Sequence, residues 1–84
     1  MSQYNPNDFV NPQQIRSPYT GETVRPTYNT FNHQGNDYEQ AVFSDPVTGQ
    51  MIKKGIVSIK DKDGNVVADY TTVLGQSVTT QSRR

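Results

Sequence analysis

The chain has 84 residues, of which 8 are Lys or Arg and 8 are Asp or Glu, so it has no formal net charge at pH 7. This balance argues against nucleic acid as a partner, because electrostatic binding needs a basic excess. Hydrophobic residues make up 31% of the chain, so it builds at most one small core. Cysteine is absent, which excludes disulfides and thiolate metal sites, and no apolar run approaches the roughly 20 residues of a membrane helix.

Residues 1–38 have the composition of an extended arm. Prolines at positions 6, 12, 18 and 26 remove backbone donors and push each preceding residue toward extended geometry. We therefore expect no helix and no long strand in this part of the chain. Composition alone favours a disordered tail, whereas the aromatic residues concentrated here favour an arm that a partner orders.

The arm carries large apolar side chains that are isolated from one another by polar spacers. This spacing is typical of anchors on another protein, which must supply pockets and strand edges to offset about 1–2 kcal/mol of ordering cost per residue. The predicted partner-anchoring residues are Tyr4, Phe9, Ile15, Tyr19, Val24, Tyr28 and Phe31.

A short pattern occurs twice, as SPYTGETVR over residues 17–25 and as DPVTGQMIK over residues 45–53. Each copy places Pro and Gly three residues apart, at Pro18 and Gly21 and again at Pro46 and Gly49, ahead of a β-capable segment. We interpret both as the same turn launching a strand. Pro26 limits the first strand to a short edge strand, and another chain is a candidate for its pairing partner. The positions that would hold zinc in a zinc knuckle lack Cys and His, so no zinc site is expected.

Residues 39–74 are predicted to form a three-stranded antiparallel meander. The first hairpin joins residues 39–44 to 51–60 around the DPVTGQ turn. The second joins residues 53–62 to 65–73 around Asp63 and Gly64, a dipeptide typical of a two-residue type I′ turn. That turn sets the register, with Ile59 opposite Ala68 and Lys60 opposite Val67.

In this register one face of the second hairpin is apolar and needs a cover. Either the arm folds back over it or a partner protein supplies the cover. The polar segment 75–84 is expected to be a mobile tail, or to add a short edge strand over residues 77–80. The predicted sheet core is Val57, Ile59, Val66, Ala68 and Tyr70.

The second hairpin, IVSIKDKDGNVVADYTT, resembles the strand-turn-strand pieces of bacterial immunoglobulin-like domains. That resemblance implies β-sheet and no particular partner, and the chain is too short for a complete sandwich. The DKDGN segment also alternates acidic and amide oxygens, as calcium loops do. It departs from the EF-hand pattern at the glycine and at the twelfth position, so we interpret it as a hairpin turn.

Groups suited to catalysis or cofactor binding are scarce. His33 lies among polar residues without a nearby nucleophile, and we expect neither an enzyme nor a cofactor or metal site. Four lysines, Lys53, Lys54, Lys60 and Lys62, leave one alternative function, a small β-sheet adaptor or single-stranded nucleic-acid-binding module. Lysines also protect sheet edges and keep small sheets soluble, which is the simpler interpretation.

The sequence thus predicts a mostly β fold with much irregular structure, in which a small meander carries a long extended N-terminal arm. We expect a non-enzymatic structural protein present in multiple copies, whose partners are other subunits of a large assembly. In its small size, lack of cysteine and isolated aromatics, the chain is similar to minor capsid, decoration or connector proteins of tailed bacteriophages. The resemblance implies a location in a virion or in the cytoplasm of the producing cell, and the N-terminus lacks a secretion signal.

Overall fold

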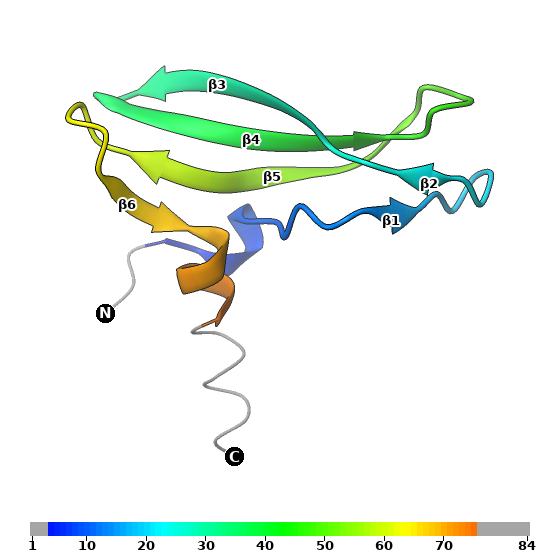
Figure 1. Ribbon diagram of the computed structural model, residues 1–84, viewed down its shortest axis with the longest axis horizontal. Helices are drawn as coiled ribbons and strands as arrows, with labels where there is room; N and C mark the ends of the chain where they lie inside the picture. Colours follow the sequence, from blue (N-terminus) through cyan, green and yellow to red (C-terminus); the bar gives the residue numbers. More distant parts are fainter. Residues whose placement is uncertain (1–3, 76–84) are drawn as a thin grey trace, which may run out of the picture.

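The computed structural model describes residues 4–75. These residues fold into a four-stranded antiparallel sheet in the order β3-β4-β5-β6, beside a two-stranded antiparallel ribbon of β1 and β2 (Figure 1). Residues 70–75 are helical. The elements in chain order are a 3₁₀ turn η1 (Pro6–Asp8), β1 (Ile15–Arg16), β2 (Thr23–Val24), β3 (Thr27–His33), β4 (Asn36–Ser44), β5 (Met51–Lys60) and β6 (Val66–Asp69).

The predicted mostly β fold is confirmed, but the sheet has four strands and not three. The additional strand, β3, comes from the segment that we expected to be an extended arm without long strands. It follows Pro26, after which no proline interrupts the chain until Pro46. Gln34 and Gly35, with φ of 53° and 84°, form the two-residue turn that returns the chain into β4. The predicted boundary at residue 38 therefore falls inside β4.

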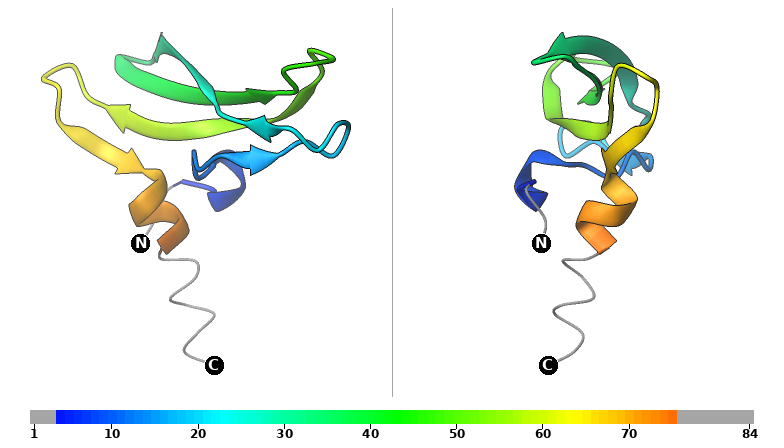
Figure 2. Two further views of the ribbon diagram at one scale, coloured as in Figure 1. Left: turned by 45° about the vertical axis from the view of Figure 1, so that its right-hand side comes forward. Right: turned by 90° about the vertical axis from the view of Figure 1, so that its left-hand side faces the viewer.

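The predicted first hairpin is confirmed. β4 ends at Ser44, β5 begins at Met51, and these two residues pair across the turn. The register shifts twice along this pair of strands, between Glu39 and Gln40 and between Phe43 and Ser44. Such bulges increase the local twist of a sheet, and Figure 2 shows the strong curl that results.

The second hairpin turns differently from the prediction. Only Gly64 has a positive φ in this loop, whereas a type I′ turn needs two such residues. The amide of Gly64 donates to the carbonyl of Asp61 at 3.0 Å, and the amide of Asp61 donates to the carbonyl of Asn65 at 2.9 Å. The loop is therefore one residue longer than predicted, and its glycine forms a bulge.

This longer loop changes which side chains reach the core. Ile59 pairs with Ala68 as predicted, but the register then shifts and Lys60 pairs with Val66. Val66 is consequently 56% exposed, so its predicted place in the sheet core is wrong. Of the other predicted core residues, Val57, Ile59 and Ala68 are buried and Tyr70 is half-buried.

The core consists of two hydrophobic clusters. Because side chains alternate along β4, Tyr38 of one cluster and Ala41 of the other point to opposite faces of the sheet. The first cluster contains Val10, Val24, Ala41, Phe43 and Val57, with Ile15, Ile52 and Tyr70 packed against it. The second contains Phe9, Ile59, Ala68 and Val73, with Tyr4, Tyr38, Ile56, Tyr70 and Leu74 packed against it.

The N-terminal segment folds back on its own sheet, which decides the question of what covers it. Phe9 forms a parallel bridge with Ile56, and the amide of Val10 donates to the carbonyl of Ile56 at 3.0 Å. A Cβ on Gly55 would lie 2.8 Å from the Val10 Cβ. Glycine at this position is therefore what allows the segment to approach β5 so closely.

The chain beyond β6 is helical over residues 70–75, where we predicted that the strand continues to residue 73. The Asp69 carboxylate accepts a hydrogen bond from the Thr72 amide at 2.9 Å, the contact of a helix N-cap. This turn places Val73 in the second cluster. The predicted edge strand over residues 77–80 lies outside the described residues.

Candidate functional site

The two copies of the repeated pattern lie against each other and share one buried carboxylate. Asp45 is 1% exposed. It accepts hydrogen bonds from the Ser17 hydroxyl and, at 2.6 Å, from the Thr20 hydroxyl, both in the first copy. Within its own copy it accepts from the amides of Val47 and Thr48 at 2.7 and 2.8 Å. The first copy therefore finds a partner within the same chain, in the second copy of the pattern.

The environment of Asp45 fixes it in the charged state. Burial alone would raise the pKa of this carboxyl, but the Ser17 and Thr20 hydroxyls and the two backbone amides stabilise the carboxylate more strongly. The net result is a pKa far below the ordinary range of aspartate. No buried side-chain nitrogen or oxygen atom within residues 4–75 lacks a hydrogen-bond partner. The buried polar groups that join the two turns are therefore all hydrogen-bonded within the chain.

The prediction that the same turn is used twice holds in atomic detail. In each copy the glycine has a φ of 78°. The amide of Gly21 donates to the carbonyl of Ser17 at 2.9 Å, and the amide of Gly49 donates to the carbonyl of Asp45 at 2.8 Å. The first copy closes the β1-β2 ribbon and the second closes the β4-β5 hairpin. Asp45 thus fastens the ribbon to the main sheet.

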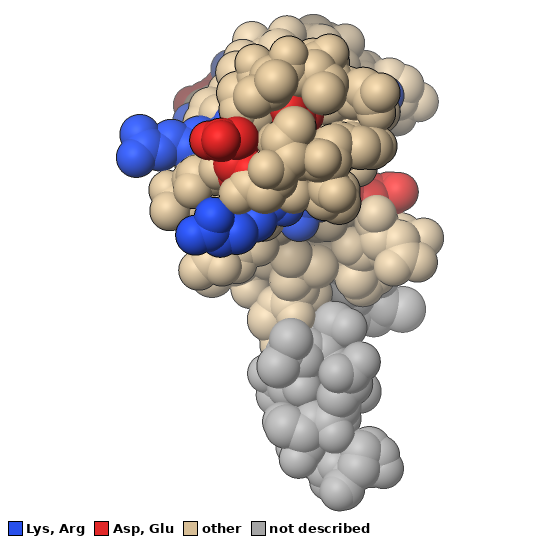
Figure 3. Space-filling model, turned by 90° about the vertical axis from the view of Figure 1, so that its right-hand side faces the viewer, with Lys and Arg blue, Asp and Glu red and all other residues tan. Residues whose placement is uncertain are grey.

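The paired turns present apolar side chains at equivalent positions. Tyr19 is 53% exposed and Val47, at the same place in the second copy, is 68% exposed. Figure 3 views the molecule from the end where both turns lie, and charged side chains of both signs are scattered there among uncharged ones. This end of the molecule therefore shows no concentration of one charge.

The edge strand β3 is the most exposed regular element in the described part of the chain. All seven of its residues are exposed, and within residues 4–75 it pairs with β4 alone. Its sequence, TYNTFNH, contains no Lys, Arg, Asp, Glu or Pro, and its register with β4 has no shift. Natural sheets commonly protect an edge with charges, prolines or bulges, and β3 has none of these. We call residues Thr27–His33 the β3 edge.

Aromatic rings extend from the β3 edge onto β4. Phe31 stacks on Tyr38 with ring centroids 5.2 Å apart and an angle of 14° between the planes. His33 meets the same tyrosine edge-on at 5.8 Å. Phe31 remains 43% exposed and Tyr28 is 53% exposed, so the edge offers aromatic surface as well as unpaired backbone groups.

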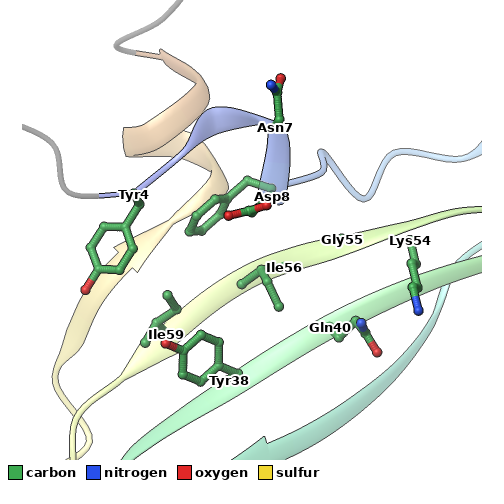
Figure 4. A pocket seen from close by; sticks show the side chains of 10 residues that line it. Tyr4, Asn7, Asp8, Tyr38, Gln40, Lys54, Gly55, Ile56 and Ile59 are labelled. Atoms are coloured by element: carbon green, nitrogen blue, oxygen red, sulfur yellow. The ribbon is translucent and has the colours of Figure 1, made fainter. Parts of the chain in front are cut away.

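An open groove of about 380 Å³ lies between the N-terminal segment and the sheet. Figure 4 shows Tyr4 and Asp8 on one side of it and Tyr38, Ile56 and Ile59 on the other. Lys54 and Gln40 lie at its far end. No group of three or more His, Cys, Asp or Glu side chains that could hold a metal ion occurs within residues 4–75.

The four lysines do not form one surface. Lys53 lies over the ring of Phe43 at 5.1 Å from its centroid, and Lys54, the next residue of β5, points to the other face of the sheet. Lys60 pairs with Asp37 across the strands, and Lys62 lies in the loop before β6.

The predicted anchoring residues divide into two groups. Phe9 and Val24 are buried in the protein's own core, and Tyr4 and Ile15 pack against it. Tyr19, Tyr28 and Phe31 are more than 40% exposed, and two of them belong to the β3 edge. The predicted turn residues Pro18, Gly21, Pro46, Gly49, Asp63 and Gly64 all lie in loops between strands.

Thr30 and Asn32 also lie on the exposed strand β3. The sequence did not predict them as residues of an interaction surface. The signal was the Gln-Gly dipeptide at residues 34–35, which a hairpin turn uses with positive φ at both positions. No helix in the described part of the chain is long and apolar enough to span a membrane. Comparisons of the chain with protein-family models, with curated proteins and with solved structures find no match.

Proposed function

We propose that this protein is a non-enzymatic structural subunit of a large multi-subunit assembly, of the decoration, cement or connector type. A bacteriophage virion is the assembly that we favour, from the similarity in size and composition to small virion proteins. The observation that carries the proposal is the β3 edge, which is exposed at all seven positions and has no charge, proline or bulge. We propose this edge, and not a free N-terminal arm, as the attachment surface.

The physical support comes from the unpaired backbone groups of an edge strand. A long, flat, uncharged edge is a template for another strand, and proteins that stay monomeric usually block it. Strand addition derives its affinity from main-chain hydrogen bonds and its specificity from alternate side chains. Tyr28 and Phe31 are the large side chains available for that purpose.

The alternative nucleic-acid function receives less support. A single-strand binding surface combines aromatic rings with a basic groove, but the lysines lie on different faces and in a loop. Binding measurements distinguish the two functions. The alternative predicts affinity for a single-stranded oligonucleotide that falls steeply with salt.

The test uses particles purified from cells that make the protein together with its natural assembly. We expect the protein to co-sediment with the particles at a fixed copy number, measured by quantitative mass spectrometry. Thr30→Lys places a charge in the β3 edge and should lower occupancy at least about tenfold. Val47→Lys adds the same charge at an exposed turn and should retain normal occupancy. A wild-type protein that stays in the soluble fraction, or a Thr30→Lys variant with full occupancy, would contradict the proposal.

A further inference from the structure

We infer that the β3 edge pairs with the β3 edge of a second copy of this chain, antiparallel about a twofold axis that lies midway between the two copies of Thr30. This inference rests on the proposed function and names the partner of the same surface. A symmetric contact of this kind is isologous, because each copy contributes the same strand. The two sheets would then continue into one, with β3 and its copy at the centre.

The hairpin turn decides which backbone groups face outward. Gln34 and Gly35 form a type I′ turn, whose hydrogen bond joins the flanking residues His33 and Asn36. Hydrogen-bonded and non-hydrogen-bonded pairs alternate along an antiparallel ladder. Alternate residues of β3, counted back from His33, therefore bond to β4, and those between them point their N–H and C=O groups to the free edge. The outward residues are Tyr28, Thr30 and Asn32.

Only one symmetric register pairs all of these outward groups with one another. With the twofold axis at Thr30, this residue faces its own copy, and Tyr28 faces Asn32 of the second copy in both directions. An axis at Asn29 would instead place Asn32 opposite Pro26, which has no N–H. An axis at Phe31 would place Tyr28 opposite Gln34, in the turn beyond the strand.

The side chains in this register are compatible with a second copy. Phe31 lies opposite Asn29 of the second copy. It is diagonal to Phe31 of the second copy, and aromatic side chains are long enough to touch across such a diagonal. Thr30 faces Thr30, a pair whose hydroxyls can bond to each other. The strand has no Lys, Arg, Asp or Glu, and the whole chain has no net charge at pH 7 with its histidine neutral, so two copies meet without repulsion. A basic or acidic peptide strand would gain no complementary charge there.

The first measurement is the mass of the full-length protein by sedimentation equilibrium across micromolar to millimolar concentrations. We expect a shift from one to two copies, which Thr30→Lys abolishes and Val47→Lys preserves. A wild-type protein that stays monomeric at all concentrations overturns the inference. If Thr30→Lys nonetheless removes the protein from particles, a strand of another subunit occupies the edge, and the proposed function stands without a second copy.

The second measurement tests the register by oxidation of single-cysteine variants, because the chain has no cysteine of its own. The Cα atoms of a hydrogen-bonded pair are about 5.5 Å apart, within the range of a disulfide. Thr30→Cys should therefore form a covalent dimer. Residue 29 lies diagonal to residue 29 of the second copy, with Cα atoms about 7–8 Å apart or more. Asn29→Cys should therefore form no covalent dimer. A dimer with Asn29→Cys and none with Thr30→Cys would overturn the twofold axis at Thr30.

Discussion

The carboxylate of Asp45 is the residue through which two distant parts of the sequence are joined. It accepts hydrogen bonds from the hydroxyls of Ser17 and Thr20, which lie 28 and 25 residues earlier. Because the carboxylate is buried and fully hydrogen-bonded, its ionised form belongs to the folded state. The pKa of Asp61 is also lowered, chiefly because its carboxylate accepts a hydrogen bond from the Asn65 amide.

Asp45 should make stability depend on pH below about 4. Its pKa is lowered in the folded protein and lies near 3.9 when unfolded, so its contribution is complete above that pH. As the pH falls further, the unfolded chain binds the proton first and the contribution is lost. We expect Asp45→Asn to lower the Tm at pH 7 by about 5 °C or more, and to flatten the fall in Tm between pH 5 and pH 2.

The measurement is thermal unfolding followed by circular dichroism at a series of pH values. Asp63→Asn, at an exposed turn residue, is the control and should keep the wild-type slope. Asp61 retains part of the pH dependence in both variants. An Asp45→Asn protein with the wild-type Tm and slope would show that the two turns do not depend on this carboxylate.

Among the elements, the β3-β4 hairpin is the one whose turn sequence fits its backbone least well. Gln34 has a φ of 53°, a conformation that costs most residues about 1 kcal/mol and that asparagine adopts more readily. We therefore expect Gln34→Asn to stabilise the protein by about 0.5–1 kcal/mol, measured by urea unfolding. Gln50→Asn, at a position without positive φ, is the matched control. Equal stability changes in the two variants would contradict this explanation.

At the scale of the whole molecule, the N-terminal segment belongs to the fold and is not a free arm. Phe9 is 8% exposed and packs against Ile59, Ala68 and Val73. We expect Phe9→Ala to destabilise the protein by about 3–5 kcal/mol, by urea or thermal unfolding. Tyr19→Ala, at an exposed turn residue, should change stability by no more than about 0.5 kcal/mol. If Phe9→Ala were as mild as Tyr19→Ala, the segment would not contribute to the core.

Local sequence patterns were sufficient to predict an element where the residues that determine it are neighbours in the sequence. Pro46 and Gly49 between two segments that contain aliphatic residues predicted the β4-β5 hairpin and its ends, since turn chemistry acts within a few residues. The repeat predicted two equal turns for the same reason. The Asp-Gly dipeptide indicated a turn at residues 63–64, but either of two loop lengths satisfies that signal. In the longer loop Val66 lies outside the core, while Ile59 still pairs with Ala68 as the shorter loop predicted.

The sequence by itself determined the β class, the turns around residues 18–21, 46–49 and 63–64, and the scarcity of groups suited to catalysis, because composition and short-range spacing carry that information. Only the tertiary structure decided that the predicted arm covers its own sheet. Isolated side chains such as Phe9 and Val24 have no local periodicity, and whether they bury in their own chain or in another depends on a surface formed by residues 17 to 64 positions later in the chain. The same holds for β3, whose exposure follows from its place at the end of the strand order. Strand order arises from long-range pairing, which no local pattern in this chain specifies.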